Sequence, residues 1–343
     1  MLAQIRTLRW WIWGLVCICN IQYGSAQELL VNVYGRQYTL LNGKWNAIID
    51  PYQQGRKTAI YRNRALKDKA DFKEYAFEGG LRLNVPSDWN SQIPELKYYE
   101  GTMWYARKFE INKKSDENLF LYFGAVNYRC RVYLNGTLIG SHEGGFTPFQ
   151  FNVTNVVKEG GNFLAVEVDN TRTADAIPAL SFDWWNYGGI TRDVMLVHTP
   201  KNYIRDYFIQ LDKYDSDRVH AEVQLSAQNA GQLVKIEIPE LKIANKVFTD
   251  GTGLAKATFR VRNLERWSPQ APKLYQVIVS SEVDEVKENI GFRNLYVKNT
   301  QIYLNDSPVF MKSIGLHEEI SQRQGLIQNK MQLHYYLKRK DWE

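Results

Sequence analysis

The residues best suited to chemistry in this chain are aromatic. The 343 residues include 10 Trp and 21 Tyr, and three of these rings, Trp184, Trp185 and Tyr187, lie close together in the sequence. Aromatic rings form platforms on which sugar rings stack, and they also build β-rich cores. The three rings therefore predict either a sugar-stacking platform or a packed core or partner-facing surface.

Other catalytic and ligand-binding patterns are missing from the sequence. It has no Gly-rich phosphate loop, no paired cysteines or His-Glu-x-x-His at metal-binding spacing, and no Gly-x-Ser-x-Gly. The five His residues are scattered, so we expect no metal site and no cofactor. The formal net charge of +6 comes without a long basic block, which argues against a nucleic-acid partner.

Short alternating segments predict that strands position these residues. Segments 118–123, 129–134 and 162–168 are rich in β-branched and aromatic residues and are bounded by turn formers. Asn135 and Gly136 both tolerate positive φ, which predicts a type I′ hairpin after the second segment. The sequence therefore predicts an all-β protein.

A change in composition near residue 200 predicts two domains. The aromatic density falls there, and apolar residues then alternate with polar ones over residues 219–225. We expect a first β domain at 28–200 and a smaller β-sandwich at 201–295, with a hinge near Pro200.

The N-terminus has the three parts of a secretory signal. Arg6 and Arg9 precede a short apolar run at 10–19, and small residues ending at Ala26 suit a signal peptidase. The run is too short to span about 30 Å of hydrocarbon, although an uncut anchor is the alternative. We expect cleavage after Ala26, no remaining membrane span, Cys130 as the one remaining cysteine, and export to the periplasm or the extracellular space.

An ordered series of motifs covers about residues 38–320. They are 41–45, 85–90, 99–109, 123–126, 132–136, 140–149, 161–166, 183–194, 267–275, 291–293 and 302–310. This series resembles the N-terminal part of glycoside hydrolase family 2, which includes β-galactosidases, β-glucuronidases and β-mannosidases. Within the family, residues 183–194 are most similar to β-glucuronidases.

The resemblance implies three parts after the signal at 1–26. These are a jelly-roll-like sugar-binding sandwich at 28–200, an immunoglobulin-like sandwich at 201–295, and a short start of a (β/α)₈ barrel at 296–343. Retaining glycosidases need two carboxylates about 5 Å apart. In the family the acid/base Glu follows an Asn in the barrel, and these 343 residues contain no Asn-Glu dipeptide. We therefore expect a chain truncated before its barrel, with no catalytic residue and no hydrolysis by itself.

Two substrate-binding residues follow from the resemblance. Asp183 matches a family residue on a loop that reaches the active site, where a carboxylate accepts hydrogen bonds from sugar hydroxyls. Its alternative role is to cap a turn or to pair with Arg192. His317 matches a family His that contacts substrate, and its alternative is simple exposure. We also expect positive φ at the turn glycines Gly144, Gly145, Gly188 and Gly189.

The resemblance implies the N-terminal, non-catalytic part of an exported family 2 exo-β-glycosidase. An intact relative would hydrolyse terminal β-galactosides or β-glucuronides with retention, so the expected partner is a carbohydrate with a terminal β-glycoside. One alternative is a module that binds glycan without cutting it. Another is a protein that docks onto a separate barrel-bearing chain or onto a second copy of itself.

Overall fold

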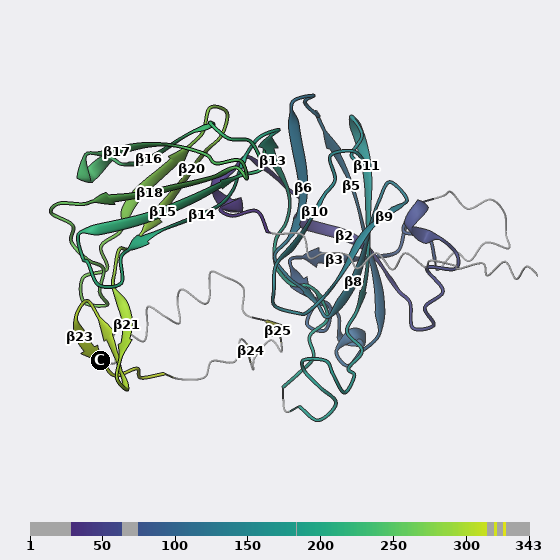
Figure 1. Ribbon diagram of the computed structural model, residues 1–343. Helices are drawn as coiled ribbons and strands as arrows, with labels where there is room; N and C mark the ends of the chain where they lie inside the picture. The colour runs from purple at the N-terminus through teal and green to yellow at the C-terminus, as the bar shows by residue number, and fades with distance from the viewer. Residues whose placement is uncertain (1–28, 64–74, 183, 314–318, 321–324, 327–343) are drawn as a thin grey trace, which may run out of the picture.

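The computed structural model describes residues 29–63, 75–182, 184–313, 319–320 and 325–326. Figure 1 shows two β-sandwiches that lie beside each other. The helical segments of these residues are 3₁₀ turns: η1 (Val33–Gly35), η2 (Ile60–Arg62), η4 (Pro94–Leu96) and η5 (Pro239–Leu241). Within the described ranges, no helix has the length and apolar character needed to cross a membrane. The all-β prediction is confirmed.

The first sandwich packs a four-stranded antiparallel sheet against a six-stranded one. The first sheet has the order β1 (Tyr38–Leu40), β13 (Val194–Pro200), β6 (Glu117–Phe123) and β10 (Phe149–Asn152). The second has the order β3 (Leu81–Val85), β2 (Gly43–Ile49), β5 (Thr102–Ile111), β11 (Gly160–Asp169), β8 (Arg129–Leu134) and β9 (Thr137–Glu143). Trp45, Trp89, Tyr105 and Phe123 are fully buried in the core of this sandwich.

The predicted hairpin joins β8 to β9. Asn135 has φ 53° and Gly136 has φ 83°, and Leu134 faces Thr137 across the turn. Two successive residues with positive φ are what a type I′ turn requires, so this prediction is confirmed. A short third sheet brings three loops together, in the order β4 (Ser87–Asp88), β12 (Gly189–Ile190) and β7 (Val126–Asn127).

The second sandwich is smaller and contains seven strands. One sheet has the order β14 (Ile204–Leu211), β15 (Arg218–Leu225) and β18 (Leu254–Arg260), and the other has the order β17 (Ile243–Phe248), β16 (Leu233–Ile238), β19 (Tyr275–Ser280) and β20 (Glu285–Ile290). Alternate residues of β15 are buried, as the sequence predicted for 219–225, because a strand points successive side chains to opposite faces.

Two small antiparallel sheets follow the second sandwich. The first contains β21 (Leu295–Lys298), β22 (Gln301–Leu304) and β23 (Ser307–Val309). The second pairs β24 (Glu319–Ile320) with β25 (Gly325–Leu326). We call β21–β23 the meander; it extends from the second sandwich at its lower end in Figure 1.

An N-terminal arm, residues 29–37, contacts both sandwiches. Leu30 and Val33 pack against Phe120, Tyr122, Met195 and Val197, on the face of β6 and β13 that points away from the first core. Arg36 then reaches the second sandwich, where its Nη1 lies 2.9 Å from Asp284 Oδ2 and its Nη2 donates to the Ile204 carbonyl at 2.6 Å. The Arg36 and Asp284 side chains are only 2% and 9% exposed, so the arm fastens the two domains with a buried ion pair.

Candidate functional site

Buried asparagines hold the segment that follows position 183. Asn127 Nδ2 donates to Asn186 Oδ1 at 3.0 Å and to the Tyr187 carbonyl at 2.6 Å. Asn170 Nδ2 donates to the Asn186 carbonyl at 2.8 Å, and the Asn186 amide donates in return to the Asn170 carbonyl. Buried amide donors are stable when they are paired, and the Nδ2 of each of these three side chains has a partner, although the buried Asn127 Oδ1 has none among the described residues. The backbone at 186–187 is therefore fixed from two directions, by β7 and by the end of β11.

Asn90 fixes the backbone of Gly188 and links it to residues 96–99. Its Oδ1 accepts a hydrogen bond from the Gly188 N–H at 2.9 Å. Its Nδ2 donates to the Leu96 carbonyl at 2.9 Å and to the Tyr99 carbonyl at 3.0 Å. One buried side chain thus ties residues 96–99 to residue 188. We call Asn90, Asn127, Asn170 and Asn186 the asparagine network; all four are 5% exposed or less.

The glycine predictions are right at two positions and wrong at two. Gly144 and Gly189 have φ of 125° and 143°, as expected. Gly145 and Gly188 do not have positive φ, and close packing is the reason for glycine there. A Cβ on Gly188 would lie 2.1 Å from the Trp89 ring, and one on Gly145 would lie 2.2 Å from an oxygen of the asparagine network.

An aromatic cleft lies where residues 97–98 meet residues 185–187. It has a volume of about 260 Å³ and is lined by Lys97, Tyr98, Trp185 and Tyr187. The Tyr98 and Trp185 rings stand 5.5 Å apart at 72°, so they form two walls of a corner. The Lys97 ammonium lies 5.1 Å from the centre of the Tyr98 ring. Rings at such an angle, with one cation beside them, can stack on a ligand and donate hydrogen bonds to it.

The predicted platform of three rings takes a different form. Trp185 is half-buried and forms a wall of the cleft, but Tyr187 is nearly buried. Trp184 is half-buried, with its ring 4.1 Å from that of Phe182. The second exposed ring is Tyr98, which sequence reasoning missed because it lies 87 positions away from Trp185. Its adjacency to the motif at 99–109 is the one signal that could have pointed to it.

Charged and phenolic groups near the cleft are held in defined states. Arg172 binds Glu100 through two nitrogens, at 2.6 and 3.1 Å, a bidentate geometry that orients both side chains. Burial raises the pKa of Tyr99, whose hydroxyl donates to the Thr102 carbonyl at 2.7 Å. Burial, and secondly the charge of Asp88, raises the pKa of Tyr105 well above its ordinary value. Both phenols therefore stay neutral near pH 7.

The two predicted substrate-binding residues, Asp183 and His317, lie outside the described residues, and so does the predicted signal at 1–26. Within the part of the chain that the structure describes, no group of three His, Cys, Asp or Glu side chains could hold a metal ion. The described cleft therefore offers aromatic rings and the Lys97 ammonium. These groups are suited to binding a hydroxylated ring.

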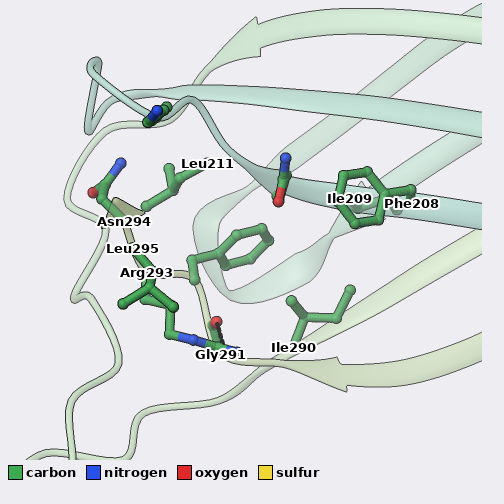
Figure 2. Close-up of a pocket in the computed structure, with 11 residues that line it drawn as sticks. Phe208, Ile209, Leu211, Ile290, Gly291, Arg293, Asn294 and Leu295 are labelled. Atoms are coloured by element: carbon green, nitrogen blue, oxygen red, sulfur yellow. Dashed lines mark hydrogen bonds between the residues drawn. The ribbon is translucent and has the colours of Figure 1, made fainter. Parts of the chain in front are cut away.

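A second pocket, of about 460 Å³, lies in the second sandwich. Figure 2 shows it between β14, which carries Phe208 and Leu211, and the segment after β20, which carries Gly291 and Arg293. Arg293 Nη1 donates to the Gly291 carbonyl at 3.2 Å, and its guanidinium lies 5.3 Å from the Trp267 ring. The pocket continues to Leu295, where the meander begins.

Comparisons with known proteins match both sandwiches to one family. The model of the sugar-binding domain of glycosyl hydrolases family 2 matches residues 39–200, and a second model, of glycosyl hydrolases family 2, matches residues 202–293. The rat β-glucuronidase is 25% identical over 358 residues, covering 92% of this chain and 53% of the relative. A β-galactosidase of Thermoanaerobacter pseudethanolicus is 27% identical over 295 residues, covering 80% of this chain and 39% of the relative.

A solved structure agrees with the sequence comparisons. The β-glucuronidase of an uncultured Clostridium species matches with a TM-score of 0.75 and 28% identity, covering 90% of this chain and 54% of that chain. The chain thus spans about half the length of the rat enzyme and of this solved relative.

Proposed function

The chain belongs to glycoside hydrolase family 2, and on this premise we propose that its two sandwiches are the carbohydrate-recognising, non-catalytic part of a β-glycosidase. The whole enzyme would hydrolyse terminal β-glucuronides or β-galactosides with retention. The observation that carries the proposal is the asparagine network, which holds the backbone at residues 186–188, three to five positions after Asp183 in the sequence, through buried hydrogen bonds. A loop that must present a ligand-reading side chain needs such support.

Asp183 is the side chain that this loop would present. Its carboxylate would accept hydrogen bonds from hydroxyls of the terminal sugar, and a charged acceptor makes these bonds strong. His317 would contact the same sugar. Neither residue breaks the glycosidic bond in this proposal, because that step needs a carboxylate pair about 5 Å apart.

Turnover assays test the non-catalytic role. We expect the purified 343-residue protein to release no product from 4-nitrophenyl β-D-glucuronide or 4-nitrophenyl β-D-galactoside. An intact family 2 β-glucuronidase in the same buffer serves as the positive control. The expectation rests on the absence of an Asn-Glu dipeptide that could supply the acid/base. Hydrolysis with retention that copurifies with this chain would refute the non-catalytic role.

Export is part of the proposal and has its own test. Arg6 and Arg9 before the apolar run at 10–19, and the small residues ending at Ala26, support it. In a bacterial host we expect the protein in the periplasm or the medium, with an intact mass that begins at Gln27. Full-length protein in the cytosol would contradict it.

A second candidate function is docking onto a separate barrel-bearing chain or onto a second copy. The observation that favours it is the meander and the residues after it, where Leu295, Val297, Phe310 and Met311 are each more than half exposed. Exposed apolar groups gathered in one region mark partner surfaces. Light scattering tests this idea: docking predicts self-association that Phe310→Ser reduces, whereas a monomer at high concentration would count against a second copy as the partner.

A further inference from the structure

We propose that the aromatic cleft is a carbohydrate subsite that binds one pyranose ring of a β-linked saccharide, in addition to the sugar that Asp183 would read. The inference deepens the proposed function and rests on it for the class of ligand. The cleft itself is built from Lys97, Tyr98, Trp185 and Tyr187.

The exposure of Tyr98 distinguishes the ring pair of the cleft from a ring pair in the hydrophobic core. Tyr98 is 70% exposed, and Trp185 is half-buried. In the same domain Trp89 and Tyr105 also pair, with ring centres 6.5 Å apart, and neither is exposed at all. A ring pair that served only packing would be buried in the same way. Tyr98 instead keeps most of its surface in solvent, at a position where a ligand can reach it.

The size and shape of the cleft suit one sugar ring. Its volume of about 260 Å³ is just below the range of about 300–1,000 Å³ that drug-sized ligands occupy. The walls meet at 72°, so a ring stacked on one wall presents its edge to the other. A pyranose offers apolar C–H groups on its face and hydroxyls around its edge, which matches two aromatic walls with the Lys97 ammonium beside them.

Hydrogen bonds hold the backbone beside both walls of the cleft before any ligand binds. Trp185 precedes Asn186, which the asparagine network fixes, and Tyr98 lies between Leu96 and Tyr99, whose carbonyls accept hydrogen bonds from Asn90. The Tyr99 N–H also donates to the Leu96 carbonyl at 3.0 Å. A site whose walls are already in place loses little conformational entropy on binding. This support distinguishes the cleft from two side chains that meet by chance on a surface.

The cleft offers a hydrogen-bond donor to the second ring of a saccharide whose terminal sugar is a uronate. Lys97 carries a positive charge next to the Tyr98 ring, while Glu100 on the same segment is neutralised by Arg172. A hydroxyl of the ring in the cleft would therefore meet a hydrogen-bond donor there, while the terminal uronate is the sugar that Asp183 would read. The probe of choice is a disaccharide with β-linked glucuronic acid at its non-reducing end, cellobiouronic acid.

Calorimetry with the purified 343-residue protein tests the subsite. We expect Tyr98→Ala and Trp185→Ala each to weaken cellobiouronic acid binding roughly three- to tenfold, the range that one ring contact contributes. Tyr98→Phe keeps the ring and should keep the affinity. Tyr52→Ala, which removes a 79% exposed tyrosine outside the cleft, is the matched control. Urea unfolding of every variant verifies that the fold is intact.

The outcomes separate this inference from the proposed function. If Asp183→Ala abolishes binding while Tyr98→Ala and Trp185→Ala do not weaken it, the subsite is refuted and the role of Asp183 stands. If the cleft variants weaken binding and Asp183→Ala does not, the subsite stands and the proposed role of Asp183 fails. If phenyl β-D-glucuronide binds as tightly as the disaccharide and depends equally on the cleft, the site takes a flat aromatic group and the pyranose assignment is overturned. If neither cellobiouronic acid nor phenyl β-D-glucuronide binds to the protein, the subsite is also overturned.

Discussion

The asparagine network predicts a large effect from one small substitution, Asn186→Ala. The side chain accepts a hydrogen bond from Asn127 Nδ2 at 3.0 Å and donates one to the Asn170 carbonyl. Alanine removes both bonds. Asn127 keeps its bond to the Tyr187 carbonyl, so its loss is about 0.5–1.5 kcal/mol, whereas a buried carbonyl left without its donor costs about 1–3 kcal/mol. We expect the free energy of unfolding to fall by about 2–4 kcal/mol.

Urea unfolding followed by tryptophan fluorescence suits this measurement. Trp45, Trp89, Trp104 and Trp185 all lie in the first sandwich, so the signal reports mainly on the domain that holds the network. The control is Asn84→Ala, which changes an exposed asparagine on β3 of the same domain and should stay within about 0.5 kcal/mol of the parent.

Coupling between network members decides whether the reasoning is right. In a double-mutant cycle of Asn186→Ala with Asn127→Ala, we expect an interaction energy of at least about 0.5 kcal/mol, because the two amides share a hydrogen bond. A loss below about 0.5 kcal/mol for Asn186→Ala, together with additive effects in the cycle, would show that solvent or rearrangement replaces these bonds. The network would then not be what fixes the loop.

Three further substitutions or treatments test other parts of the structure. Arg36→Met leaves the buried Asp284 carboxylate without its cation, so urea unfolding should show a loss of about 3–5 kcal/mol, and Asp284→Asn in the same chain should restore part of it. Gly188→Ala places a methyl group 2.1 Å from the Trp89 ring, and thermal unfolding should show a loss of about 1–3 kcal/mol from overpacking. Burial raises the pKa of the Cys130 thiol to about 12. The buried neutral thiol therefore contributes fully to stability below the pKa of the unfolded thiol, near 8.5, and this contribution is lost as pH rises toward 12. Peptide mapping at pH 8 should find this thiol alkylated by iodoacetamide in urea but not in the native protein.

Strand predictions succeeded where the pattern is local. Residues 129–134 form β8 with the predicted bounds, and residues 219–225 bury every second side chain. Alternation with period two is a direct consequence of strand geometry. The turn at Asn135 and Gly136 is equally local, because positive φ at two successive residues is a property of those residues themselves.

The asparagine network could not be predicted in this way. Asparagines are common turn formers, and nothing in the sequence marks Asn90 and Asn170 as buried. Their partners lie 98 and 16 positions away, and only the short sheet of β4, β12 and β7 brings those loops together. The aromatic cleft depends on the same sheet, so Tyr98 was missed for the same reason.

The N-terminal arm is the other feature that sequence patterns did not reveal. Residues 29–37 have no helical or strand periodicity, and they were assigned to the first domain alone. Arg36 finds its partner Asp284 at a separation of 248 residues. A lone arginine predicts exposure, and burial becomes favourable only because a carboxylate and the Ile204 carbonyl receive its guanidinium.

The proposed function separates recognition from bond cleavage, and the chemistry of the described groups supports that separation. Proton transfer to a leaving oxygen needs an acid whose pKa lies near the working pH. Tyr99, which adjoins the aromatic cleft in the sequence, has a phenol pKa raised by burial. Its hydroxyl can take part in hydrogen bonds but does not exchange protons near pH 7. The proposed function therefore assigns this region to selecting and orienting a sugar, and it places the acid and the nucleophile outside the described loop and cleft.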